Sequence, residues 1–249
     1  MSSPNPFANL TFEDFRRLAV DESLSKYAKI GFPDAYREGF EATIFTDIRG
    51  KLTNLDIKGG NILDIGPGCS DLPAMLIDLC RQQTHQLTLI DSAEMLDLLP
   101  DAPFIDKVAA LYPICPDLLT EYAGRMNVIL CYSVLHYVLV DTAFFRFLDT
   151  SLALLAPGGQ MLIGDIPNVS KRNRFFASAA GVQFHQNFTR SNTQPELTLN
   201  QIAHDQIDDA VVFALLQRAR AAGFDAYLLP QDPALPMANR REDILIVRP

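Results

Sequence analysis

Residues 61–71, NILDIGPGCSD, place two glycines and two carboxylates where an apolar strand would end and a helix would begin. Glycine allows a sharp turn and a close approach to a ligand, and the first turn of the helix offers unpaired N–H groups. A dinucleotide-binding fingerprint has its third glycine where this chain has Asp71. A carboxylate there would repel a pyrophosphate but suits a ligand with an ammonium group. Asp64, just before the turn, adds a second acceptor on the same side.

A further carboxylate, Asp91, ends the next predicted strand, residues 86–90. A carboxylate at this position can hold both ribose hydroxyls of an adenosine cofactor. S-adenosylmethionine (SAM) combines adenosine with an ammonium group, so we predict that SAM is the cofactor. The alternative is NAD(P), which the missing third glycine disfavours. The residues predicted to bind SAM are Asp64, Gly66, Pro67, Gly68, Asp71, Asp91, Ser92, Met95, Leu111, Cys131 and Tyr132.

The pattern L-D-x-G-x-G at residues 63–68, the acidic end of the second strand and L-x-P-G-G at residues 155–159 resemble the class I SAM-dependent methyltransferases. The resemblance covers about residues 60–248. It implies an α/β, Rossmann-like fold: a seven-stranded, mostly parallel sheet with an antiparallel last strand and helices on both faces. Many relatives carry an acidic residue after strand three that accepts the adenine amino group. Here residues 109–113 read AALYP, so we expect the adenine to lie among apolar side chains and backbone groups, and the sequence identifies no side chain as its polar partner.

The order of predicted elements fits that fold. Strands are expected around residues 62–65, 87–90, 107–111, 128–132 and 161–164, and two more follow a helix over residues 208–223. Their continuous apolar runs indicate a parallel sheet covered on both faces. We expect residues 1–56 to form a helical extension or lid, capped at Thr11 or Asp14, and residues 57–249 to form the SAM-binding domain. Residues 168–208 are polar and too long for an ordinary loop, so we expect them to cover the acceptor site.

Three side chains could take or orient a proton of the methyl acceptor. Asp165 leaves the fifth strand, His136 follows the fourth, and His185 lies in the long polar segment. A carboxylate can accept a proton from a hydroxyl or amine, and histidine titrates near neutral pH. Each has a structural alternative: a carboxylate that caps a turn, a packed histidine and a solvated histidine, respectively.

Basic residues gather at residues 171–174, KRNR, and at Arg240–Arg241. Such clusters are usually solvated, yet both follow elements that should end near the acceptor, and arginine binds phosphate and carboxylate with two parallel hydrogen bonds. We therefore predict a small polar acceptor, methylated on oxygen or nitrogen; an anionic sugar or nucleotide sugar would explain the two basic clusters, and solvated surface charge is the alternative. The chain also resembles, at residues 27–33 and 235–241, a bacterial group associated with surface-glycan pathways. The residues predicted to bind the acceptor are Tyr137, Arg172, Arg240 and Arg241.

Composition narrows the partners. A net charge of −9 argues against a nucleic acid, whose binding requires many Lys and Arg contacts. The four cysteines form no C-x-x-C pair, so neither a metal site nor a disulfide framework is expected. The longest apolar stretch, residues 128–140, is shorter than the roughly 20 residues of a membrane helix. We expect a soluble cytoplasmic protein, a monomer or homodimer, with no membrane partner. Two alternative functions remain: a protein of this fold that binds SAM without methylating, as a regulatory or scaffolding partner or for another SAM reaction, and an NAD(P)-dependent oxidoreductase.

Overall fold

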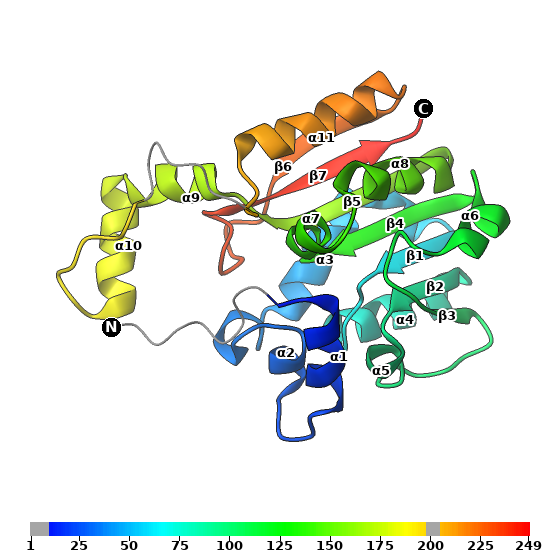
Figure 1. The fold of residues 1–249 in the computed structure, drawn as a ribbon, viewed down its shortest axis with the longest axis horizontal. Coiled ribbons are helices and arrows are strands. Elements are labelled where there is room, and N and C mark those ends of the chain that lie inside the picture. The colour runs from blue at the N-terminus through cyan, green and yellow to red at the C-terminus, as the bar shows by residue number, and fades with distance from the viewer. Residues whose placement is uncertain (1–9, 198–204) are drawn as a thin grey trace.

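The computed structural model describes residues 10–197 and 205–249 and contains a seven-stranded sheet between two layers of helices (Figure 1). The strand order is β3-β2-β1-β4-β5-β7-β6. Strands β1 to β5 pair in parallel, and β7 runs antiparallel to both β5 and β6. The predicted fold class is therefore confirmed. The strands are β1 (Asn61–Ile65), β2 (Gln86–Asp91), β3 (Ile105–Ala109), β4 (Met126–Tyr132), β5 (Leu155–Pro167), β6 (Asp225–Pro230) and β7 (Arg241–Val247).

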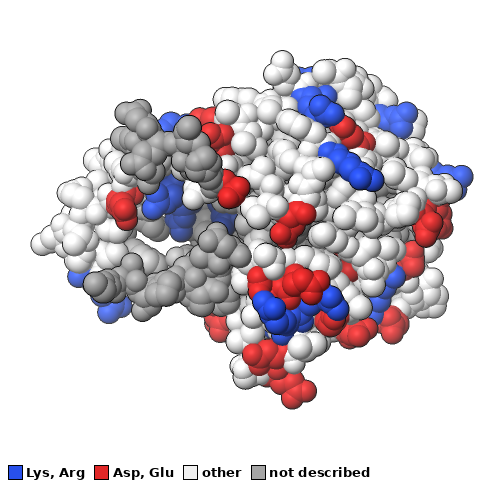
Figure 2. Space-filling model, in the orientation of Figure 1, with Lys and Arg blue, Asp and Glu red and all other residues white. Residues whose placement is uncertain are grey.

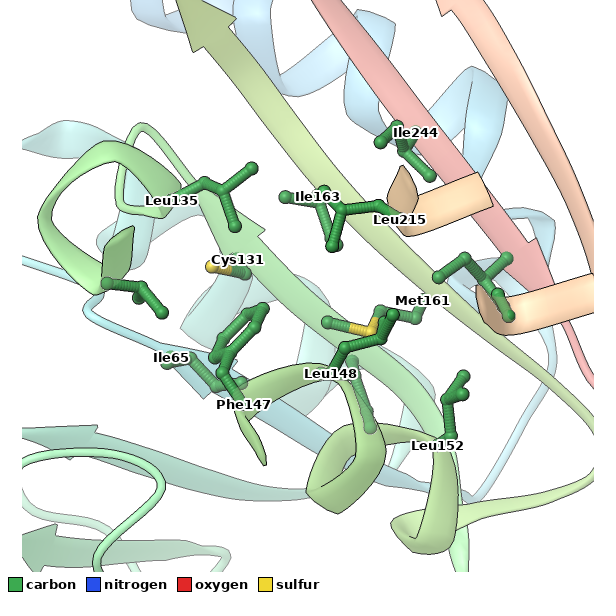
Figure 3. Close-up of a cluster of buried hydrophobic side chains, with 14 of the residues drawn as sticks. Ile65, Cys131, Leu135, Phe147, Leu148, Leu152, Met161, Ile163, Leu215 and Ile244 are labelled. Atoms are coloured by element: carbon green, nitrogen blue, oxygen red, sulfur yellow. The ribbon is translucent and has the colours of Figure 1, made fainter. Parts of the chain in front are cut away.

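Alternate residues of each strand enter opposite layers of the core, as the pleat of a strand requires. In β4, Ile129 and Cys131 join one cluster of buried side chains, whereas Val128, Leu130 and Tyr132 join the other. Figure 3 shows the first cluster, in which Phe147 and Leu148 pack against Ile163 and Met161 of β5. The helices in contact with this cluster are α6 (Pro116–Tyr122), α7 (Leu135–Asp141), α8 (Phe144–Leu154) and α11 (Asp209–Ala221).

The opposite layer and the N-terminal segment complete the fold. Thr11 begins the first helix with a capping box: its hydroxyl accepts from the Asp14 N–H, and the Asp14 carboxylate accepts from the Thr11 N–H. The predicted cap is therefore confirmed at Thr11. The remaining elements of this part of the chain are α1 (Phe12–Val20), α2 (Lys26–Lys29), η1 (Asp34–Tyr36), α3 (Glu41–Lys51), η2 (Thr53–Asp56), α4 (Asp71–Gln83) and α5 (Ala93–Leu96).

The polar segment 168–208 is not the long loop that its composition suggested. It contains α9 (Val169–Phe176) and α10 (Ala179–Thr189), and residues 198–204 lie outside the described part. The side chains of Asn168 and Ser178 cap the two helices by accepting from backbone N–H groups. The two helices pack on each other, and Figure 1 shows α10 standing away from the sheet. The prediction of a loop from the polar composition was wrong, because phenylalanines interspersed among Asn, Gln and Ser give the two helices an apolar face.

Two expected boundaries also shift. Strand β3 covers Ile105–Ala109 rather than residues 107–111, and a cis peptide bond joins Tyr112 to Pro113 beyond it. The fifth strand was expected around residues 161–164, after the L-x-P-G-G pattern of residues 155–159. Helix α8 does end at Leu154, but these residues already belong to β5, whose pairing with β4 is irregular between Met126 and Val128. Gly158 adopts the left-handed conformation within this stretch, with φ of 73°.

Candidate active site

An open cavity lies at the carboxyl ends of β1, β2 and β4, where ligands bind in open α/β sheets. It holds about 930 Å³ of empty space, part of it continuous with solvent, which is within the range of small-molecule sites. Helices α1 and α2 and the residues after them supply one wall, with Phe12, Phe15, Ile30, Phe32 and Arg37. Predicted site residues that line the cavity are Gly66, Pro67, Gly68, Asp91, Met95, Leu111, Tyr132 and Tyr137.

The glycine turn has the geometry of a cradle. Gly66 and Gly68 have φ values of 70° and 67°, which side chains rarely allow. A Cβ at Gly66 would lie 2.7 Å from Val134 Cγ2, and one at Gly68 would lie 2.6 Å from Ile30 Cγ2. The Gly68 N–H donates to Asp91 Oδ2 at 3.3 Å, so the turn and the end of β2 are fixed to each other. A side chain at either position would displace Val134 or Ile30, both of which line the cavity.

Two carboxylates stand beside this turn: Asp64, which is buried, and Asp91, which is partly exposed and lines the cavity. Among the described residues, neither Asp64 nor Asp91 lies within ion-pair distance of a Lys, Arg or His. Burial raises the pKa of Asp91 to about 6, although the N–H groups of Ser92 and Gly68 donate to it. Burial and the negative charge of Asp91 together raise the pKa of Asp64 to about 8. A positively charged ligand such as SAM would supply the missing counter-charge, so these residues fit the predicted cofactor.

Four residues predicted to bind SAM lie outside the cavity wall: Asp64, Asp71, Ser92 and Cys131. Asp71 forms an ion pair with Lys26, Oδ1 to Nζ 2.5 Å, and its side chain is half exposed. Ser92 is buried and begins α5, because its hydroxyl accepts from the Met95 N–H at 3.2 Å. Cys131 is buried in the core below the cavity, where burial raises the pKa of its thiol. Asp64, too, is almost fully buried, at 4% exposure, rather than part of the wall.

A network of polar side chains connects the ends of β4, β5 and β7. Ser133 lines the cavity; its hydroxyl donates to Asp165 Oδ2 and accepts from Arg37 Nη2, both at 2.5 Å. Arg241 Nη1 donates to the same Asp165 oxygen at 3.0 Å, and Gln231 Nε2 donates to the other oxygen at 3.3 Å. Asp165 is therefore a buried carboxylate held between two guanidinium groups.

The backbone of this network is unusual. Ser133 and Asp165 both have positive φ, 62° and 56°, a conformation that non-glycine residues adopt at a cost of about 1–3 kcal/mol. The Asp165 N–H donates to Asp243 Oδ1 at 2.8 Å, and Asp243 is itself paired with Lys51 at 2.7 Å. These contacts hold the two strained residues in place, which is the pattern expected where side chains must point into a functional site.

A second, smaller recess lies next to the cavity. Asp165, Gln231, Tyr36 and Met237 are among its lining residues. Arg37 and Tyr132 line both the recess and the cavity, so the two spaces share a wall. The Arg37 guanidinium is buried and lies over the Phe32 ring, 4.3 Å from its centroid. Asp165 thus faces the recess rather than the large cavity.

Neither predicted histidine reaches the cavity wall. The His136 ring packs on Tyr137, with centroids 3.9 Å apart, and its Nδ1 is buried without a hydrogen-bond partner among the described residues. Burial, reinforced by the positive charge of Arg241, lowers the pKa of His136 to about 3, so it stays neutral at neutral pH. His185 lies on α10, which is remote from the glycine turn (Figure 1), and its Nε2 contacts Thr193 Oγ1 at 3.4 Å.

Reasoning from sequence missed three residues of the site: Arg37, Ser133 and Gln231. Ser133 stands three residues before His136 and was within reach, because it directly follows the fourth strand. Arg37 and Gln231 are 128 and 66 residues from Asp165 along the chain, and no local pattern marks them as its partners.

The chain was compared with known proteins once its geometry was described. A family described as "Methyltransferase domain" matches residues 37–206. No curated protein matches the sequence. Among the described residues, no helix is long and apolar enough to cross a membrane, and no group of three or more His, Cys, Asp or Glu side chains could hold a metal ion.

Several solved structures share the fold. The N-methyltransferase NodS from Bradyrhizobium japonicum, in complex with S-adenosyl-L-homocysteine, has 15% sequence identity to this chain and a TM-score of 0.55. The match covers 96% of this chain and 98% of that one. The plantazolicin methyltransferase BpumL, in complex with a monoazolic analogue and S-adenosyl-L-homocysteine, has 14% identity and a TM-score of 0.57, covering 95% and 96%.

A larger relative is matched only in part. The CurJ carbon methyltransferase has 16% identity and a TM-score of 0.56, and the match covers 94% of this chain but 64% of that one. At these identities the structures establish the fold, whereas the family match covers more than half of the chain. The protein belongs to the class I SAM-dependent methyltransferase family, with SAM as its cofactor.

Proposed function

We propose that this protein transfers the methyl group of SAM to an oxygen or nitrogen of a small polar acceptor. The observation that carries the proposal is the glycine cradle beside two carboxylates, Asp64 and Asp91, that have no cation within ion-pair distance in the part of the chain that the structure describes. SAM brings positive charge to this position and supplies an activated methyl group on its sulfonium. The rest of the reaction consists of alignment of the acceptor and exclusion of water.

We assign the two ends of the cofactor to different carboxylates. Asp91 closes β2 and would accept hydrogen bonds from the ribose hydroxyls, while Met95 and Leu111 offer apolar surface to the adenine. The narrow turn at Gly66 and Gly68 would hold the amino-acid part, with Asp64 as the buried counter-charge of the ammonium group. Asp71, Ser92 and Cys131 lie outside the cavity wall and would hold the residues that contact the cofactor in position.

We place the acceptor at the shared wall of the cavity and the recess. Asp165 is our candidate for the group that orients the nucleophile or receives its proton, and it would act together with the Ser133 hydroxyl, which does line the cavity. Arg37 and Arg241 fix the carboxylate, since both donate to Oδ2. His136 is a weaker candidate because its low pKa makes it a poor base, and it would serve to orient Tyr137. His185 would enter only if α10 moved.

We propose that the segments around the cavity control access to it. Phe12 and Phe15 of α1 and Ile30 and Phe32 beyond it form the wall opposite the sheet, which fits a lid made by residues 1–56, of which residues 1–9 lie outside the described part. The segment 168–208 is the second candidate lid. Closure of either would exclude water from the methyl group.

The finer features of the acceptor are proposals of the same kind. An anionic sugar or nucleotide sugar is favoured by the basic residues near β5 and β7, and we expect neither nucleic acid nor membrane as a partner of so acidic a chain. We also propose that the protein acts in the cytoplasm of a bacterium, as a monomer or homodimer. A protein that binds SAM without methylating is the second candidate, favoured by the absence of an acidic residue for adenine at residues 109–113.

Binding of SAM and transfer of its methyl group are tested separately. Asp91→Ala should weaken SAM binding by about tenfold or more, because hydrogen bonds of about 0.5–1.5 kcal/mol each are lost to the ligand. Asp97→Ala, in the turn after α5, is the matched control and should bind SAM normally. Unchanged SAM affinity in a folded Asp91→Ala protein would overturn the cofactor assignment. Transfer of labelled methyl from SAM to a panel of sugar phosphates, amines and alcohols then separates a methyltransferase from a binding protein.

A further inference from the structure

The basic residues near β5 and β7 divide into two classes by their partners. Arg174 forms an ion pair with Asp209, and Arg241 pairs with Asp165. Arg172 and Arg240 have no carboxylate within ion-pair distance among the described residues. The two segments outside the description, residues 1–9 and 198–204, contain no Asp or Glu in their sequence. In a chain with 30 acidic and 21 basic residues, two half-buried arginines without a counter-charge need an explanation.

The two unpaired arginines are neighbours and are held on adjacent aromatic rings. The Arg172 guanidinium lies 5.1 Å from the centroid of Phe176, and that of Arg240 lies 5.8 Å from the centroid of Phe184. The two rings are themselves 6.3 Å apart. Burial lowers the pKa of Arg240, and the positive charges of Arg241 and Arg172 act in the same direction. The guanidinium groups therefore repel each other, and an anion between them would relieve that repulsion.

Within residues 10–197 and 205–249, few of the N–H groups of these arginines have an acceptor. Arg240 Nη1 donates to the Asn239 side chain at 2.9 Å, and Arg172 Nη1 makes a long contact of 3.5 Å with the Asn173 side chain. A ring below a guanidinium holds its plane but leaves its edge free, so each arginine can still present parallel N–H groups to an oxyanion. In Figure 2, Lys and Arg side chains gather inside the hollow on the side where Figure 1 places α9 and α10.

The position of the pair relates it to the site of methyl transfer. Tyr36 and Asp165 both act on the charge of Arg240, and both line the recess that shares Arg37 and Tyr132 with the large cavity. A series of polar groups thus leads from the cavity through the recess to the two arginines. An acceptor that extends along it would have its nucleophile at Asp165 and its far end at Arg172 and Arg240.

We propose that Arg172 and Arg240 form a binding site for an oxyanion of the methyl acceptor, a phosphoryl group above all, remote from the methylated atom. The proposal rests on the proposed function and sharpens it, because it assigns the anionic end of the acceptor to two residues and removes Arg174 and Arg241 from that role. Two cations favour a dianion over a monoanion, so pyrophosphate should bind more tightly than inorganic phosphate, and phosphate more tightly than acetate.

The test uses these three anions as probes, titrated into the full chain in a calorimeter at low ionic strength. The double variant Arg172→Gln/Arg240→Gln should bind pyrophosphate about tenfold to a hundredfold more weakly than the wild type, because charge-assisted contacts are lost at two positions. The matched control is Arg174→Gln, which removes a paired arginine two residues along the same helix. Its affinity should stay within about twofold, since exposed pairs contribute little.

A second variant and a second ligand keep the result clear. Arg172→Lys/Arg240→Lys retains both charges without the forked geometry and should bind pyrophosphate with intermediate affinity. It also provides the measurement if the glutamine variant does not fold. SAM affinity, measured on the same samples, should not change in any variant.

Three results would overturn the proposal: no saturable binding of pyrophosphate to the wild type, equal affinity in the double variant, or an equal loss in Arg174→Gln. Failure of the proposed function is distinguishable, because the protein would then bind pyrophosphate through these arginines but would not bind SAM.

Discussion

Binding of SAM should release a proton from Asp64 at neutral pH. Burial, together with the charge of Asp91, raises the pKa of the Asp64 carboxyl to about 8, so the group is protonated in the free protein at pH 7. An ammonium and a sulfonium placed at the glycine turn would favour the ionised carboxylate and lower that pKa. Cofactor and proton therefore compete for one buried group.

The size of the effect follows from the pKa. A group with a pKa of about 8 carries roughly 0.9 proton at pH 7. It would carry roughly 0.1 proton if the cofactor lowered its pKa by about two units, which is within the range of about 1–3 units for an Asp beside a positive charge. The expected release is roughly 0.8 proton for each SAM bound. Because binding releases a proton, SAM affinity should increase with pH, by about sixfold for each pH unit near pH 7, and become constant above about pH 8. Asp91, with a pKa of about 6, extends the same trend to lower pH.

Calorimetry measures this release directly. The apparent enthalpy of SAM binding at pH 7 is determined in phosphate and in Tris, whose ionisation enthalpies differ, and its slope gives the number of protons released. Asp64→Asn should reduce the slope to near zero. Asp71→Asn is the control, because Asp71 is half exposed and paired with Lys26. Equal enthalpies in both buffers, or an undiminished release in Asp64→Asn, would refute the argument.

The same raised pKa makes a prediction for the stability of the free protein. The pKa of Asp64 in the folded protein lies above its ordinary value of 3.8, so the folded state holds this proton more tightly than the unfolded state does. The stability that the protonated group gives the fold is therefore fully present below pH 3.8 and is lost as the pH rises toward 8. Asp64→Asn should therefore raise the melting temperature, and more so at pH 8 than at pH 5; a pH-independent difference would contradict the assignment. Asp165→Asn should lower turnover by about 10²–10⁴-fold with SAM affinity little altered, since it retains the shape but removes the base and the charge. Normal methylation by that variant would leave Asp165 as a structural carboxylate. Trypsin cleavage after the exposed Arg190 should slow when SAM and an acceptor are both bound, and equal rates in all conditions would count against a lid in residues 168–208.

The parts of the fold that could be predicted from sequence are those whose signals lie in residues close together along the chain. The strand, the turn at Gly66 and Gly68 and the start of the helix that follows occupy eleven neighbouring residues, and each has a backbone requirement that residue type reveals. Asp91 was found for the same reason, because it ends a continuous apolar run. The alternation of strands and amphipathic helices then determined the parallel sheet and the helices on both faces.

The acceptor side could not be predicted in the same way, because its contacts join distant parts of the chain. Asp165 is held by Arg37, Gln231 and Arg241, which are 128, 66 and 76 residues away. Lys26 neutralises Asp71 across 45 residues, and no pattern around either residue indicates it. Helices α9 and α10 were missed for a different reason: their apolar face is made by phenylalanines among Asn, Gln and Ser, and it packs mainly on the other helix of the pair.

The charges of the site are separated in a way that favours one orientation of its ligands. Asp64 and Asp91, without a cation among the described residues, lie at the cofactor end. Arg172 and Arg240, which have no carboxylate within ion-pair distance among the described residues, lie beyond the acceptor site that we propose, and Asp165 with Arg37 and Arg241 forms an ion-paired cluster between them. A cationic cofactor is attracted to the first end and repelled from the last, and the reverse holds for an anionic acceptor. An anionic dinucleotide would meet the two carboxylates at the glycine turn, so the same separation of charge that would admit SAM disfavours NAD(P) there.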